Sequence, residues 1–333
     1  MSLPALRFLR SRYPEAAIHL AAKGYVEDIF TTVEGIDGTL RLPAGNGIPA
    51  MIRAVGVLKP HRFDLGILFT NSFHSALLFK LAGVGRLAGY KRDGRGFLLA
   101  HKWDFPKGNE HHIHFYADLI GKLPGPEVAS GGGSEGMSGL LTVTGDEKRL
   151  MREILSKEGV ETGTTWVGIS PFAAFGPAKE WPGARFAALI QRIHSRFPGT
   201  RILIFGSGKE GDRAESIAGF TPGVVNLAGR LSLRQSIAAM SLCSLFISND
   251  SGLMHVAAAL ACPTIALFGP TRPEKTSPLH SDVRILHKPA DCAPCIHRLC
   301  PADHRCMDAI GVDEVLEAVV EMMGRVEKQK NDA

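Results

Sequence analysis

Residues 245–270 constrain the fold of this chain most, because they show the pattern of strand, polar turn, helix and second strand. Residues 245–248 are apolar enough for a buried parallel strand, and residues 252–261 are apolar all round, as in a buried helix. Asn249, Asp250 and Ser251 lie between them. Open α/β sheets bind ligands at this junction, where free backbone N–H groups favour anions. The pattern therefore predicts an anion site in a parallel α/β fold.

Two interpretations of this polar cluster remain. His255 follows Ser251 by four residues, so the two side chains can share one side of the first helical turn. In the simpler interpretation, Asp250 and Ser251 only cap the helix. A cap explains one polar residue, whereas a ligand site explains the whole cluster. We favour the ligand site.

Length and composition indicate a two-domain protein of the cytoplasm. A chain of 333 residues is long for a single core. No apolar stretch reaches the roughly 18–20 residues that a membrane helix needs. Arg7, Arg10 and Arg12 interrupt the N-terminal apolar stretch, which is unlike a secretory signal. We therefore expect six reduced cysteines rather than a disulfide framework.

The positive charge is concentrated in the first part of the chain. Residues 1–123 hold 16 Lys and Arg against 10 Asp and Glu, and the remainder holds 22 against 23. One interpretation is an ordinary solvated surface. The other is that the first domain faces an acidic partner, such as a phosphorylated glycolipid or an anionic leaflet. No nucleic-acid-binding motif accompanies the charge, so we expect no nucleic acid.

Strands and helices alternate most clearly in the second half of the chain. This alternation predicts parallel sheets with right-handed crossovers. The Pro-, Gly- and Ser-rich residues 123–139 predict a linker, and we place the domains at 1–145 and 146–333. The predicted strands are 166–170, 201–205, 224–227, 245–248 and 264–268, and the last helix is predicted over 312–327.

Residues 206–211, GSGKEG, match the GxGxxG pattern of dinucleotide-binding proteins. The next predicted strand, 224–227, ends without the acidic residue that would bind a ribose. We interpret the glycines as a tight turn near a nucleotide. An NAD-dependent enzyme remains an alternative, which stabilisation by ADP but not by NAD would exclude.

Two patterns bear on metals. The chain contains no Asp-x-Asp pair, the usual clamp for a divalent metal on a diphosphate. Four cysteines gather near the C-terminus, and their spacing differs from two paired CxxC knuckles. We favour packed free thiols or a conditional disulfide over a structural zinc site. The four residues are Cys292, Cys295, Cys300 and Cys306.

Several motifs resemble those of the ADP-heptose:lipopolysaccharide heptosyltransferases, glycosyltransferase family 9. A chance match is improbable, because many motifs occur in the same order over most of the chain. The resemblance implies the GT-B fold, with two Rossmann-like domains and a cleft between them. The motifs are GYKRDGRGFLL (89–99), GPAKEWP (176–182), NLAGRLSL (226–233), DSGLMH (250–255), FGPTRP (268–273) and the cysteine-rich tail.

The resemblance also implies an activity. It is that of an inverting, metal-independent glycosyltransferase without a cofactor, which moves heptose from ADP-heptose to the heptose of heptosyl-Kdo-lipid A in the lipopolysaccharide inner core. Lys179 would stabilise the charge that develops on the leaving diphosphate. Glu210 would accept hydrogen bonds from ribose or sugar hydroxyls. The other residues that the resemblance places at the donor are Asp250, Ser251, Gly252, Leu253 and His255.

The first domain would bind the acceptor, with peripheral contact at the cytoplasmic face of the inner membrane. Family members carry a strand and a Gly-Asp pair ahead of the segment that matches residues 2–7, and that Asp is taken as their general base. Here a helical pattern with Pro4 in its first turn follows Met1 directly. An upstream start, a shortened chain or lost activity would explain this, and the intact later motifs favour the first. Lost activity would leave an impaired nucleotide-sugar binder.

Overall fold

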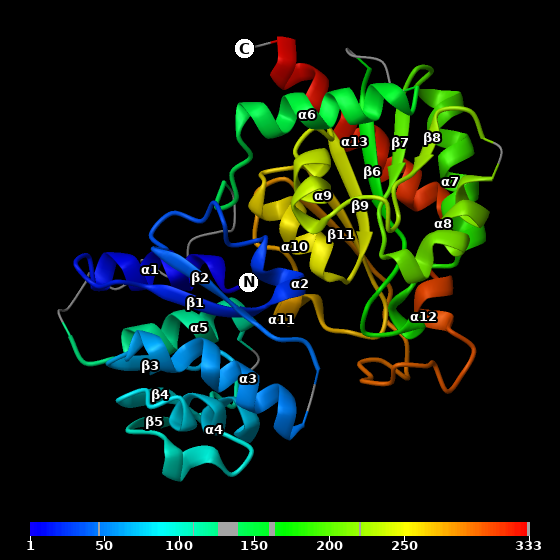
Figure 1. Cartoon of the computed structure of the whole chain (residues 1–333). Helices are drawn as coiled ribbons and strands as arrows, with labels where there is room; N and C mark the ends of the chain where they lie inside the picture. The colour runs from blue at the N-terminus through cyan, green and yellow to red at the C-terminus, as the bar shows by residue number, and fades with distance from the viewer. Residues whose placement is uncertain (46, 109, 126–138, 160–163, 220, 332–333) are drawn as a thin grey trace. The chain divides into compact units, whose positions relative to one another are not determined.

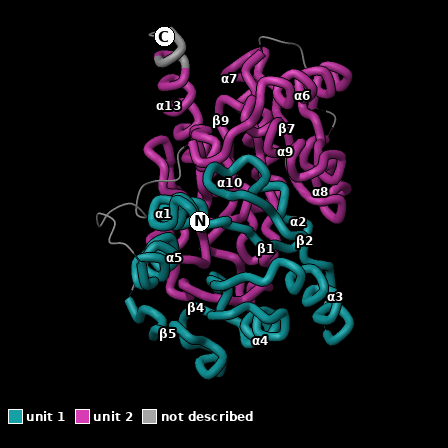
Figure 2. Tube along the Cα trace, turned by 60° about the vertical axis from the view of Figure 1, so that its left-hand side comes forward, with its two compact units in different colours: residues 1–135 teal, residues 136–333 magenta. Residues whose placement is uncertain are grey.

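The computed structural model describes residues 1–45, 47–108, 110–125, 139–159, 164–219 and 221–331 (Figure 1). The chain divides into two compact units, Met1–Glu135 and Gly136–Ala333 (Figure 2). Most of the predicted linker, residues 126–138, lies outside the described residues. In the described part of the chain, no helix is long and apolar enough to cross a membrane.

The second unit is built on a six-stranded sheet in which every paired neighbour is parallel. The spatial order is β11–β10–β9–β6–β7–β8. The chain runs from β6 outward to β8 and then returns to the other side of β6 for β9, so the order reverses between β6 and β9. The strands are β6 (Trp166–Ser170), β7 (Arg201–Ile204), β8 (Val224–Asn226), β9 (Leu245–Asn249), β10 (Thr264–Phe268) and β11 (Val283–His287).

The five strands predicted for this half are confirmed, each to within one residue. β11 was not predicted, because this edge strand leaves its residues Arg284 and Ile285 exposed, whereas β8, at the other edge, has no exposed residue. β11 therefore lacks the continuous apolar run of a buried strand.

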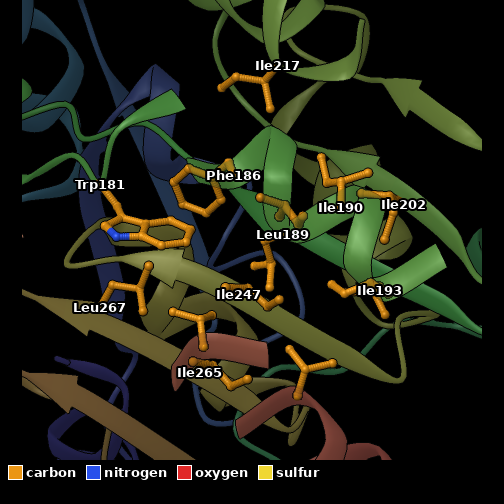
Figure 3. Close-up of a cluster of buried hydrophobic side chains, with 14 of the residues drawn as sticks. Trp181, Phe186, Leu189, Ile190, Ile193, Ile202, Ile217, Ile247, Ile265 and Leu267 are labelled. Atoms are coloured by element: carbon orange, nitrogen blue, oxygen red, sulfur yellow. The ribbon is translucent and has the colours of Figure 1, made fainter. Parts of the chain in front are cut away.

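Helices cover both faces of this sheet. On one face, α7 (Gly183–Arg196), α8 (Gly211–Ala218) and α13 (Val312–Asn331) share a core with Ile247 and Ile265 (Figure 3). On the other face, Met254 of α10 (Gly252–Ala259) packs on Ala266 and Phe268 of β10. Each fully buried aliphatic side chain contributes about 1.5–3 kcal/mol of transfer free energy.

The last helix, α13, is longer than predicted and ends at Asn331 rather than near residue 327. Its charged final turns consist of good helix formers. Arg325 also pairs with Glu321 one turn earlier, at 2.5 Å.

The first unit contains two parallel sheets. β1 (His19–Lys23) pairs with β2 (Gly38–Leu42), and β4 (Arg86–Lys91) lies between β3 (Leu65–Ile67) and β5 (His101–Asp104). The sequence predicted that this unit lacks the first strand found in family members, and the strands described here do not test that prediction. The helices of this unit include α1 (Leu3–Arg12), α3 (Ile48–Leu58), α4 (Phe73–Leu81) and α5 (His112–Gly121).

An ion pair joins two helices of the second unit, α6 (Gly145–Lys157) and α9 (Leu233–Met240). Glu147 forms a capping box with Thr144 at the start of α6. Arg234 of α9 donates to both carboxylate oxygens of Glu147, at 2.6 and 2.7 Å. Chiefly because of the Arg234 hydrogen bonds, the pKa of Glu147 falls from 4.5 to about 2.

The variant Glu147→Gln tests this pair. Because the folded-state pKa is depressed, the carboxylate stabilises the fold above about pH 4.5, and this contribution is lost as the pH falls toward 2. We expect the variant to lose about 1–2 kcal/mol of unfolding free energy at neutral pH, and the difference to narrow below about pH 4.5. Urea unfolding at several pH values measures both effects. Glu153→Gln, at an exposed position of α6, is the control; a pH-independent difference would contradict the prediction.

Candidate functional site

Lys179 and Asp250 meet where the strand order of the second unit reverses. Lys179 lies in the loop that follows β6, and Asp250 directly follows β9. Their Nζ and Oδ2 atoms are 2.5 Å apart, although 71 positions separate them in sequence. The crevice at such a reversal is where open α/β sheets bind ligands.

This ion pair is largely buried. The side chain of Asp250 is 7% exposed and that of Lys179 is 15% exposed. Thr271, after β10, donates its hydroxyl to the same Oδ2 at 2.7 Å. The ammonium also lies 5.0 Å from the ring centroid of Phe175, within cation–π range. An ammonium has three N–H donors, and one bond to Asp250 leaves two for a ligand.

Asn249 joins both ends of the loop that carries Lys179. This side chain is completely buried. Its Nδ2 donates to the carbonyl of Pro171 at 2.7 Å, and its Oδ1 accepts from the backbone N–H of Trp181 at 3.0 Å. The loop is therefore closed by the residue that directly precedes Asp250. The site residues predicted from the sequence did not include Asn249, although it belongs to the polar cluster.

Glu180 braces the same loop from within. It is buried, and its Oε1 accepts from the backbone N–H of Ala173 at 3.1 Å. Its Oε2 pairs with Arg213 of α8, whose guanidinium also lies over the ring of Phe172. The carboxylate thus ties the loop to itself and to a helix, which restricts where Lys179 can lie.

The cysteine-rich segment supports this loop from outside. The carbonyl of Arg298 accepts from the N–H of Ala178 at 3.1 Å, and His304 Nε2 lies 3.2 Å from the carbonyl of Ala178. Gly176 has φ +151, and a Cβ there would lie 2.4 Å from the Arg298 oxygen. Only glycine permits this approach.

The cysteines of this segment are free thiols in the structure. Cys306 is buried, and Cys292 is exposed. Among the described residues, no three His, Cys, Asp or Glu side chains are grouped to hold a metal ion. The zinc alternative at Cys292, Cys295, Cys300 and Cys306 therefore has no support in the structure.

The amino end of α10 is open in the sense that its N-cap side chain forms no capping hydrogen bond. Ser251 occupies the N-cap position, but its side chain makes no capping hydrogen bond, and its Oγ lies 3.1 Å from Ser248 Oγ. The capping interpretation is therefore wrong for Ser251, and the described hydrogen bonds of the Asp250 side chain go to Lys179 and Thr271. Gly252 is exposed, and Leu253 and His255 are half-buried on the same first turn. Backbone N–H groups at such a helix end attract anions.

Glu210 lies at the carboxyl end of β7, the strand next to β6. It ends the short turn η4 (Gly208–Glu210), where its Oε2 accepts from Ser207 N and Oγ at 2.6 and 2.8 Å. A Cβ on Gly229 would lie only 2.3 Å from the Cα of Gly208. The glycines of residues 206–211 therefore serve a close approach of two backbone segments.

Replacing Lys179 with methionine tests the buried pair. The change leaves a buried carboxylate with Thr271 as its partner, so we expect a loss of about 3 kcal/mol in unfolding free energy. Lys179→Met combined with Asp250→Asn should recover most of that loss, because an amide needs no counter-charge. Urea unfolding measures both variants, with Lys209→Met at an exposed position as control. A double variant no more stable than the single one would show that charge is not the cause.

Comparisons with known proteins identify the family. The model of glycosyltransferase family 9 (heptosyltransferase) matches residues 51–305. Lipopolysaccharide heptosyltransferase 2 of Salmonella typhimurium is 30% identical over 86% of this chain and 83% of that protein. Lipooligosaccharide heptosyltransferase 2 of Haemophilus influenzae is 30% identical over 86% of this chain and 84% of its own length.

Solved structures agree. The structure of E. coli ADP-heptose lps heptosyltransferase II has a TM-score of 0.81 and 26% identity, and covers 98% of this chain and 95% of that one. A family 9 glycosyl transferase from Veillonella parvula also gives a TM-score of 0.81 over 97% of this chain and 93% of that one; at 17% identity it shows the fold alone. The chain thus has the predicted α/β fold with parallel sheets, and it belongs to glycosyltransferase family 9, the heptosyltransferases.

Proposed function

We propose that this protein transfers heptose from ADP-heptose to the heptose of the lipopolysaccharide inner core. The observation that carries the proposal is the Lys179–Asp250 pair beside the open amino end of α10. Support comes from relatives named heptosyltransferase 2, which match over 86% of the chain.

Charge stabilisation explains how this geometry would act. As the sugar leaves ADP, negative charge develops on the diphosphate. The free N–H donors of Lys179 and the backbone N–H groups near Gly252 supply fixed positive charge at that point. Asp250 orients the ammonium, and the chemistry requires no other cation.

The remaining donor contacts follow from positions along the same edge of the sheet. Glu210 keeps its Oε1 for a ribose or sugar hydroxyl, because the turn of η4 uses Oε2. Leu253 and His255 would line the pocket beside the α10 end. Inversion requires a single displacement in which a base takes the proton of the acceptor hydroxyl. We assign that base to no residue of this chain.

The two units would divide the substrates. The second unit would bind ADP-heptose, because it contains the pair and the open helix end. The first would bind the phosphorylated glycolipid acceptor, since it carries the surplus of Lys and Arg. The acceptor's lipid would place the protein at the cytoplasmic face of the inner membrane. An impaired sugar-nucleotide binder has no support in the comparisons, whose matches extend across both units.

A transfer assay tests the function. With ADP-heptose and heptosyl-Kdo-lipid A, the wild type should release ADP and extend the acceptor by one heptose. The Lys179→Met/Asp250→Asn double variant should lose about 100-fold in kcat, because it lacks the ammonium that stabilises the leaving group. Since this variant should retain the fold, the loss would not reflect unfolding.

Lys157→Met, at an exposed position of α6 outside the proposed donor site, is the matched control and should keep wild-type turnover. Absence of transfer by the wild type would reject the function. Full turnover by the double variant would reject the role of Lys179 alone.

A further inference from the structure

Arg95, in the first unit, is a buried cation that the proposed chemistry does not use. It begins the turn η2 (Arg95–Leu98) within the segment GYKRDGRGFLL, and its exposed fraction is 0%. Buried arginines normally face carboxylates. Among the described residues Arg95 forms no ion pair, and its hydrogen bonds go to neutral oxygens. Burial lowers the pKa of Arg95, and nearby Asp93 opposes this shift.

These hydrogen bonds converge on the loop between β3 and α4. Nη1 donates to the carbonyl of Thr70, and Nη2 donates to Asn71 Oδ1 at 3.2 Å. Nε donates to the carbonyl of Tyr90, the β4 residue beside the loop, at 3.0 Å. One planar guanidinium therefore holds the loop against the neighbouring strand.

Two neighbours of Arg95 reinforce the arrangement. Asp93 accepts from the backbone N–H of Phe73 at 2.7 Å, which fixes the start of α4. Gly89 leaves space for the guanidinium, because a Cβ there would lie 3.1 Å from Nη2 of Arg95. The spacing of Gly89, Asp93 and Arg95 in the motif thus serves the loop at residues 70–72.

The loop has the position and the free groups of a binding element. It follows β3 at the carboxyl edge of a parallel sheet, where open α/β folds bind ligands. Thr70 is exposed and Asn71 is half-buried. Asn71 uses its Oδ1 to accept the hydrogen bond from Arg95, so the two N–H donors of its Nδ2 are left for another group. In the described chain, neither Asn71 Nδ2 nor Thr70 Oγ1 has a hydrogen-bond partner.

We propose that Arg95 is a positioning residue for the acceptor sugar: it fixes residues 70–72 so that Asn71 Nδ2 and Thr70 Oγ1 bind hydroxyl groups of that sugar. Amide and hydroxyl groups suit a neutral polyol, since each can bond a sugar oxygen without the cost of burying a second charge. The inference rests on the proposed function, with the first unit as the acceptor unit.

The test compares the effect of each variant on KM for the acceptor with its effect on KM for ADP-heptose. In Arg95→Lys, the charge remains and the fork of donors is lost. We expect KM for the acceptor to rise about tenfold, equivalent to 1.4 kcal/mol, and KM for ADP-heptose to stay within about twofold. Asn71→Ala should have a similar effect, and the double variant should be no worse than either single one, because both act on one contact. Arg86→Lys, exposed at the other end of β4, is the control.

Three results would overturn the proposal: an unchanged acceptor KM in either variant, equal changes for both substrates, or independent effects in the double variant. If Arg95→Lys fails to fold, Asn71→Ala alone must still raise the acceptor KM. Saturation-transfer NMR with a heptose-terminated oligosaccharide separates this inference from the function. If the wild type transfers no heptose but binds the oligosaccharide more tightly than Arg95→Lys does, the function alone is refuted. If the wild type neither transfers heptose nor binds the oligosaccharide, both the function and this inference are refuted.

Discussion

The buried ion pair between Lys179 and Asp250 is the interaction on which the candidate site depends. Two charges removed from water are stable only when their geometry is well fixed. Asn249 closes the lysine loop at both ends, and Glu180 braces it from within. Arg298 supports it from the C-terminal segment. The polar contacts around β6 and β9 therefore serve one purpose, which is to keep an ammonium at a set place.

In the first unit, a different buried residue also fixes a loop at the carboxyl edge of a sheet. There, a loop at the carboxyl edge of the sheet is fixed by Arg95, which comes from the neighbouring strand's own following turn. In both units a fully buried polar side chain holds the loop: Asn249, at the end of the adjacent strand β9, in one unit, and Arg95, in the turn after the adjacent strand β4, in the other. A parallel sheet favours this arrangement, because adjacent strands end at the same edge and the loops that follow them lie within hydrogen-bonding distance.

Much of this was predictable from the sequence, and the rest depended on long-range contacts. Apolar runs alternating with amphipathic helices predicted five of the six strands of the second unit's sheet, and the polar cluster after β9 marked the carboxyl edge of that sheet. The partner of Asp250 could not be predicted from spacing, because Lys179 is 71 positions away. The role of Asn249 was also hidden, because an amide after a strand can face either the helix or the neighbouring loop. β11 was not predicted, because its exposed residues interrupt the apolar run that identifies a buried strand.

The pair also explains how a lysine can remain available to an anion while it is bound to an acid. Asp250 contacts one N–H of the ammonium through Oδ2, and Thr271 shares that oxygen, which weakens its hold on Lys179. A diphosphate brings more negative charge than one carboxylate and several acceptor oxygens. In the proposed site, a diphosphate would therefore engage the remaining donors without breaking the bond to Asp250. Asp250 orients the ammonium through this ion pair. The amino end of α10 adds the positive end of the helix dipole at the same edge of the sheet.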